Sequence, residues 1–112
     1  MLISAITCFG IAVLIGIIML MCVAQGKRFP KIVALTHGAF AITGTILLII
    51  HTLKHTQTAF ITITTLFIIA GAGGLFLFYK DITGKSIPKL FAAGHGALAF
   101  VTFLFLVVFA FV

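Results

Sequence analysis

Apolar residues fill four long stretches of the chain, and short polar segments separate them. The stretches cover residues 2–24, 31–53, 56–79 and 88–112. A helix that crosses the hydrocarbon core of a bilayer needs about 20 mainly apolar residues, and each stretch has about that length. The apolar runs are continuous and lack the period-two alternation of transmembrane β-barrel strands. The pattern therefore predicts four transmembrane helices.

The polar segments between these helices contain the residues that end one helix and start the next. Gly26 and Pro30 lie in the first segment, the second is little more than Lys54 and His55, and Gly84 lies in the third, before Pro88. Connections this short make consecutive helices antiparallel neighbours. We therefore predict an all-α fold, an up-down-up-down four-helix bundle in the membrane, as one domain over residues 1–112.

Composition and charge fit this prediction. Of the 112 residues, 63% are hydrophobic and 7% are charged, which is unlike a soluble domain. One basic residue, Lys54, lies in the second segment; the others lie in the first and third, as Lys27, Arg28, Lys31, Lys80, Lys85 and Lys89. Cytoplasmic loops are rich in Lys and Arg, so we expect segments 25–31 and 80–89 in the cytoplasm and both termini outside, in a bacterial inner membrane. The net charge of +6 then reflects topology and does not indicate nucleic-acid binding.

An internal repeat relates the two halves of the chain. The matching positions lie 58 residues apart, from Gly26 and Gly84 onward, and define units of about 1–54 and 59–112. They are Gly26/Gly84, Lys27/Lys85, Pro30/Pro88, Lys31/Lys89, Ala34/Ala92, His37/His95, Gly38/Gly96, Ala39/Ala97 and Ala41/Ala99, and in the preceding helices Thr7/Thr65, Phe9/Phe67, Ile11/Ile69, Ala12/Ala70 and Gly16/Gly74. Each unit is a helix, a basic loop and a helix, so the two copies run parallel about an axis along the membrane normal.

The repeat places two histidines at one depth in the membrane. His37 and His95 each follow the first lysine of their helix by six residues, which is roughly 9 Å inward from the basic edge. An ionisable side chain at this depth needs a partner and is a functional hypothesis by default. The second and fourth helices are diagonal in a square bundle, with axes roughly 11–14 Å apart. This separation suits a planar cofactor with an imidazole on each face, and a haem iron takes two axial histidines.

Small and basic residues near the histidines are consistent with a haem. Small side chains on the two histidine-bearing helices would let a flat macrocycle approach the backbone; they are Ala34, Gly38, Ala41, Ala92, Gly96 and Ala99. Lys31, Lys89 and Arg28 lie at the edge toward which anionic propionates would point. Each feature also has a plain reading, because small residues pack membrane helices and basic loops set topology.

Paired histidines on two helices of a four-helix membrane bundle resemble the transmembrane b-type cytochromes. The resemblance rests on His37 and His95, with Gly38 and Gly96 beside them. It implies one non-covalent haem b with both histidines on the iron, and electron transfer to or from a quinone or a redox partner protein. No Cys-x-x-Cys-His motif for covalent attachment occurs. An electron carrier is favoured over an enzyme, because the only acidic residue, Asp81, is expected in the basic third segment and leaves no carboxylate within the membrane for catalysis. If the protein is an enzyme, it would be a haem-dependent oxidoreductase.

Three alternatives stay open from the sequence. His51 and His55 could hold a second haem or a surface metal, although the repeat-equivalent of His51 is Phe109, and solvated outer-loop residues are the plainer reading. The chain could be a structural subunit of a larger membrane complex with no cofactor. It could also form a homodimer through glycines, namely Gly16, Gly71 and Gly74.

Overall fold

The computed structural model describes all 112 residues and contains four α-helices and no strand. They are α1 (Leu2–Ala24), α2 (Lys31–Lys54), α3 (Thr58–Ile82) and α4 (Lys89–Phe111). All four are long and apolar enough to cross a membrane. The predicted fold class, an all-helical four-helix bundle, is confirmed.

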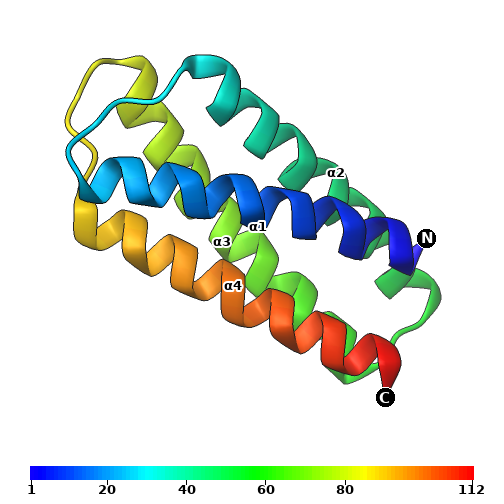
Figure 1. The fold of residues 1–112 in the computed structure, drawn as a ribbon. Coiled ribbons are helices and arrows are strands. Elements are labelled where there is room, and N and C mark those ends of the chain that lie inside the picture. Colours follow the sequence, from blue (N-terminus) through cyan, green and yellow to red (C-terminus); the bar gives the residue numbers. More distant parts are fainter.

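The helices form an elongated bundle of 41 × 22 × 19 Å. Each helix packs against two neighbours, whereas the backbones of the diagonal pairs, α1 with α3 and α2 with α4, stay apart, with no Cα atoms within 8 Å of each other. Both termini lie at one end of the bundle, and the α1–α2 and α3–α4 loops lie together at the other end (Figure 1). The two histidine-bearing helices therefore face each other across the interior, as the repeat predicts.

The α1–α2 and α3–α4 loops begin with the same hydrogen-bonded turn. Gly26 and Gly84 follow α1 and α3 with φ of 70° and 71°, a conformation that favours glycine. The next amide in each copy, of Lys27 or Lys85, bonds back to a carbonyl in the last turn of the helix at 2.8 and 3.0 Å. Pro30 and Pro88 then precede α2 and α4 in extended conformations. The repeated sequence thus produces a repeated loop start at the basic end.

Helix α3 differs from its predicted span at both ends. It begins at Thr58 instead of residue 56 and continues to Ile82, one turn beyond Tyr79. Asp81, which we expected in the third loop, instead lies in the last turn of this helix and is buried, with 6% exposure. The apolar run ends at Tyr79, and in the extra turn of helix the Asp81 carboxylate pairs with Lys31 of α2, a contact that stabilises it there.

The interior changes character along the bundle. In the half that contains the termini, large side chains form the hydrophobic core, with Phe9 and Phe67 stacked at 3.9 Å between ring centroids. This core consists of Ala5, Phe9, Leu48, Phe60, Ile63, Phe67 and Leu106. From mid-bundle toward the basic loops, the buried apolar residues are all alanines: Ala12, Ala34, Ala70 and Ala92. One half is therefore filled by large side chains, whereas the basic half has small side chains around its histidines.

Candidate functional site

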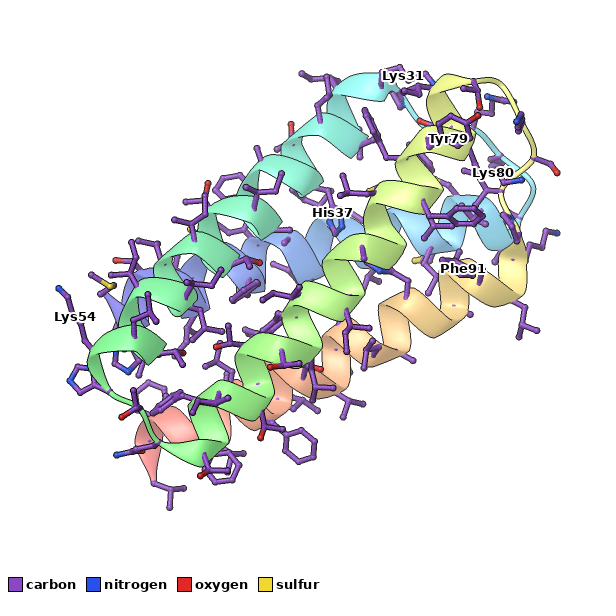
Figure 2. All side chains as sticks on the ribbon, turned by 180° about the vertical axis from the view of Figure 1, so that it is seen from behind. Lys31, His37, Lys54, Tyr79, Lys80 and Phe91 are labelled. Carbon is purple, nitrogen blue, oxygen red and sulfur yellow. The ribbon has the colours of Figure 1, made fainter.

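His37 of α2 and His95 of α4 approach each other in the basic half of the bundle. Their ring centroids are 6.4 Å apart, with an angle of 78° between the ring planes. Both residues are half-buried, and Figure 2 shows His37 among the helices rather than on the outer surface. Because the backbones of α2 and α4 stay apart, only side chains bridge this diagonal.

A backbone hydrogen bond holds the His37 ring. Its Nδ1 lies 2.8 Å from the carbonyl oxygen of Ala12 on α1, so Nδ1–H donates and the carbonyl accepts. A neutral imidazole that donates through Nδ1 keeps a free electron pair on Nε2. The bond therefore leaves His37 with the nitrogen that can bind a metal ion.

His95 has the equivalent backbone neighbour but no hydrogen bond to it. The backbone of Ala70, the repeat-equivalent of Ala12, lies beside the His95 ring. The contact does not reach hydrogen-bond geometry, since Nδ1 of His95 is buried without a partner. A buried polar nitrogen without a partner is destabilising, so a further hydrogen bond would stabilise His95 more than His37.

Two glycines that match in the repeat provide space for the histidine rings. A Cβ atom placed on Gly16 of α1 would lie 3.1 Å from Cε1 of His37, and one on Gly74 of α3 would lie 3.1 Å from Cε1 of His95. A Cβ placed on Gly71, by contrast, would have no neighbour within 4 Å. The sequence predicts helix packing or a dimer contact for all three glycines. The repeat match of Gly16 with Gly74 is the sequence signal that distinguishes these two from Gly71.

The Phe9–Phe67 stack lies on the terminal side of the histidines. The rings are nearly parallel, at 5°, and come from α1 and α3, the helices that provide the two glycines. Gly44 of α2 gives Phe9 its space, because a Cβ there would lie 3.1 Å from the ring. Phe9 and Phe67 match in the repeat, but the sequence alone predicts no role for them.

The alanines predicted to pack against a haem lie at two levels of burial. Ala34 and Ala92 are buried at 7% exposure each, so they line the interior. Ala41 and Ala99 are half-buried. All four belong to the histidine-bearing helices, and their burial agrees between the two repeats.

The glycines beside the histidines are less closely packed than the alanines. A Cβ on Gly38 would meet nothing within 4 Å, and one on Gly96 would lie 3.4 Å from Cδ2 of Leu20 on α1. No other side chain thus approaches Gly38, whereas Gly96 contributes to the contact between α1 and α4.

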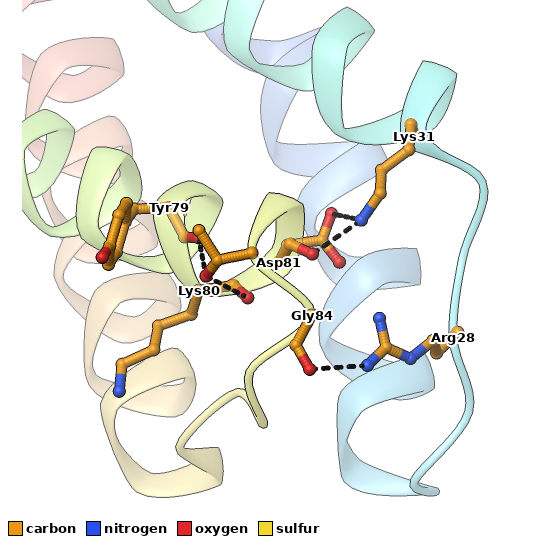
Figure 3. Close-up of polar contacts among 7 residues, drawn as sticks. Arg28, Lys31, Tyr79, Lys80, Asp81 and Gly84 are labelled. Atoms are coloured by element: carbon orange, nitrogen blue, oxygen red, sulfur yellow. Dashed lines mark hydrogen bonds and ion pairs between the residues drawn. The ribbon is translucent and has the colours of Figure 1, made fainter.

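Lys31, predicted to bind a propionate, contacts Asp81 (Figure 3). Its ammonium nitrogen lies 3.0 Å from Oδ2 of Asp81 and donates to the Asp81 backbone carbonyl at 2.7 Å. The lysine side chain is 51% exposed and the carboxylate 8% exposed. Lys31 thus neutralises the single acid of the chain and binds a carbonyl in the last turn of α3, where a cation is favourable.

The other two predicted propionate ligands also contact backbone carbonyls. Arg28 donates to the carbonyl of Gly84 at 3.4 Å (Figure 3), and Lys89 donates to the carbonyl of Ala24 at 3.4 Å. Neither has a carboxylate partner, since Asp81 pairs with Lys31. Their role toward propionates stays a prediction.

His51 and His55 lie in the other half of the bundle. Their rings stack at 4.5 Å, and the edge of Phe60 meets His51 at 4.9 Å. Helix α2 ends at Lys54, so His55 follows the helix, with its ring Nδ1–H donating to the His51 carbonyl at 3.2 Å. This pair is separate from His37 and His95, and no three His, Cys, Asp or Glu side chains of the chain gather where they could hold a metal ion.

The fold and site together define a bundle of four potentially membrane-spanning helices with two repeat-related histidines facing each other inside it. No family model, no curated protein and no solved structure matches the chain.

Proposed function

We propose that this protein is a membrane b-type cytochrome that holds one haem between α2 and α4 and transfers electrons. The observation that carries the proposal is the 6.4 Å between the ring centroids of His37 and His95. Two imidazoles that bind one ion through bonds of about 2 Å have centroids on the order of 6 Å apart. His37 and His95 would therefore hold the iron of one haem between them.

The hydrogen bond of His37 supports this role. Histidines that bind metals almost always donate their other ring N–H to a carboxylate, a backbone carbonyl or water, which fixes the tautomer and orientation. Nδ1 of His37 donates to the Ala12 carbonyl at 2.8 Å, so Nε2 is the nitrogen assigned to the iron. His95 lacks this hydrogen bond, and the Ala70 backbone beside its ring is the acceptor that we propose for its Nδ1–H.

The number of protein ligands also favours haem over a bare ion. Structural zinc sites have four protein ligands, whereas this site offers two histidines and no third His, Cys, Asp or Glu close by. A porphyrin provides four nitrogens of its own, so two histidines complete the coordination. When bound, the haem supplies reversible one-electron chemistry at its iron.

The remaining residues of the site hold and shield it. Gly16 and Gly74 allow each ring to lie close to a neighbouring helix, and the Phe9–Phe67 stack closes the interior toward the termini. Low solvent access around a haem is one of the features that set its potential. The proposed partner for electron exchange is a membrane-soluble quinone or a redox protein docking at the basic end, which we propose faces the cytoplasm of a bacterium.

Absorption spectra test this proposal. The protein is expressed with haem supplied, purified in detergent, and measured oxidised and after dithionite reduction. We expect a Soret band that shifts on reduction, sharp α and β bands, and one extractable haem per chain. Folded, full-length protein without these bands would refute the proposal and leave the structural-subunit alternative.

Three alanine variants assign the ligands. His37→Ala and His95→Ala should each remove the low-spin spectrum. His51→Ala is the matched control, because His51 is also a half-buried histidine of α2 but stacks on His55. Loss of haem from His51→Ala would show that the site is assigned to the wrong histidines.

A further inference from the structure

A surface groove of about 470 Å³ runs between α1 and α4 at the basic end of the bundle. It is lined by five apolar residues and one lysine: Leu20, Val23, Ala24, Lys89, Leu90 and Ala93. Leu90 is 88% exposed, so the groove lies on the outer face of the bundle, where lipid would surround it. It is separate from the space between the two histidines.

The repeat provides a second copy of the corner in which the groove lies. A corner here is the contact between two adjacent helices at the basic end, and the repeat-equivalent of the α1–α4 corner is the α2–α3 corner. Three lining residues are replaced there, Leu20 by Phe78, Ala24 by Ile82 and Ala93 by Leu35. Each of these three positions thus has a larger side chain in the other corner. The α1–α4 contact is thus built from smaller residues than the α2–α3 contact at these positions.

The two corners also differ in charge. Lys31 and Lys89 are repeat-equivalent, and each reaches across to the end of the helix from the other unit. The carboxylate of Asp81 lies 3.0 Å from the Lys31 ammonium, whereas Val23 stands at the position equivalent to Asp81. Lys89 therefore has only the Ala24 carbonyl at 3.4 Å, and its positive charge is uncompensated at the edge of an apolar groove.

We propose that this groove binds an anionic phospholipid, whose headgroup phosphate pairs with Lys89 while an acyl chain lies along Leu20, Ala24 and Ala93. The lipid supplies the negative charge that Asp81 supplies to Lys31 in the other corner. Anionic lipids concentrate around basic residues at the cytoplasmic surface, where the phosphate lies at the level of the basic loops. The site does not depend on the haem proposal.

Native mass spectrometry tests the lipid site. Haem-free protein in detergent is mixed with equal amounts of phosphatidylglycerol and phosphatidylcholine, and the first bound lipid is identified. We expect wild type to retain phosphatidylglycerol, and Lys89→Gln to reduce the preference roughly fivefold. Lys27→Gln is the charge-matched control, because Lys27 is an exposed lysine of the same end and lies outside the groove; it should keep the preference. Equal loss in both variants, or no preference in wild type, would overturn the proposal.

Residues of the equivalent α2–α3 contact provide a second set of variants. Val23→Asp gives Lys89 an internal carboxylate and should abolish the preference, while Ala24→Ile with Ala93→Leu should block the acyl chain. Retention of the preference in both variants would exclude the groove. Haem is then added to wild type, and the preference for phosphatidylglycerol is measured again. An unchanged preference supports the lipid site. Loss of the preference would assign Lys89 to a propionate and overturn the lipid assignment.

Discussion

A histidine inside a membrane bundle needs a partner for each ring nitrogen, because lipid offers none. His37 meets half of this need within the chain, through the Ala12 carbonyl on α1. His95 leaves its buried Nδ1 unpartnered, although the Ala70 backbone lies beside the ring. The two rings therefore have equivalent positions in the repeat and unequal contacts with the backbone.

A comparison of Gly74, which lies against the His95 ring, with Gly71, which has open space, gives the first prediction. Ala at an open helical position stabilises a helix by about 0.5–1 kcal/mol relative to Gly, so Gly71→Ala should be stabilising or neutral. Gly74→Ala places its Cβ 3.1 Å from Cε1 of His95 and should be less stable than Gly71→Ala by about 1–2 kcal/mol. Unfolding in increasing dodecyl sulfate, followed by circular dichroism, measures both. Equal gains would show that the ring moves away freely.

The Lys31–Asp81 pair gives the second prediction, which compares the loss of stability when either partner is replaced. Lys31→Gln leaves a carboxylate of 8% exposure without its cation and should lower the free energy of unfolding by about 1–3 kcal/mol. Asp81→Asn leaves a lysine that is 51% exposed to solvent, so its effect should be about 0–1 kcal/mol. The same unfolding assay measures both variants and the double variant. A larger loss in Asp81→Asn would contradict the proposed asymmetry.

The sequence predicts that His37 and His95 lie at one depth, but it does not predict that Asp81 is buried in a helix. His37 and His95 are visible because a repeated position fixes their depth, and helix geometry converts sequence spacing into distance. The burial of Asp81 depends on Lys31, which lies 50 residues away in the chain. No local pattern records such a contact, so the acid was expected in a loop. The unpartnered Nδ1 of His95 is likewise a matter of tertiary geometry.

At the scale of helices, packing divides the bundle into a half filled by large side chains and a half with small ones. The apolar lengths predicted which residues are helical, but which residues lie inside depends on helix rotation. Helix rotation is weakly encoded here, because every face of a membrane helix is apolar. The repeat could have supplied it: Phe9 with Phe67, and Leu48 with Leu106, are buried in matching pairs.

The aromatic stack gives the third prediction. Phe67→Ala removes a ring that is 5% exposed and stacked on Phe9 at 3.9 Å. A cavity in a soluble core destabilises by about 3–5 kcal/mol for Phe→Ala, but a membrane helix keeps its apolar surroundings when helices separate, so about 1–3 kcal/mol is expected. Phe105→Ala is the control, since that ring is 49% exposed on the outside and its loss should change stability by about 0.5 kcal/mol or less. Thermal unfolding in detergent compares them.

For the whole molecule, the parallel repeat brings both basic loops to one end and both termini to the other (Figure 1). Three labelled lysines mark the two ends, with Lys31 and Lys80 at the basic end and Lys54 at the opposite end (Figure 2). The basic end also carries the Lys31–Asp81 pair, and the lipid groove lies there at the α1–α4 contact. Charge, the histidine site and the groove thus all belong to the same half of the bundle.

The orientation of the bundle is the fourth prediction. Six of the seven basic residues lie at the loop end, so this end should face the cytoplasm and the α2–α3 connection should face outward. Single cysteines at Gln57 and at Ser86, both exposed, report the two ends once Cys8 and Cys22 are replaced by alanine. A membrane-impermeant maleimide added to intact spheroplasts should label Gln57→Cys at once and Ser86→Cys only after lysis. Because the site lies nearer the loop end, the reverse result would contradict the predicted orientation and would also move the proposed haem and lipid sites to the outer leaflet.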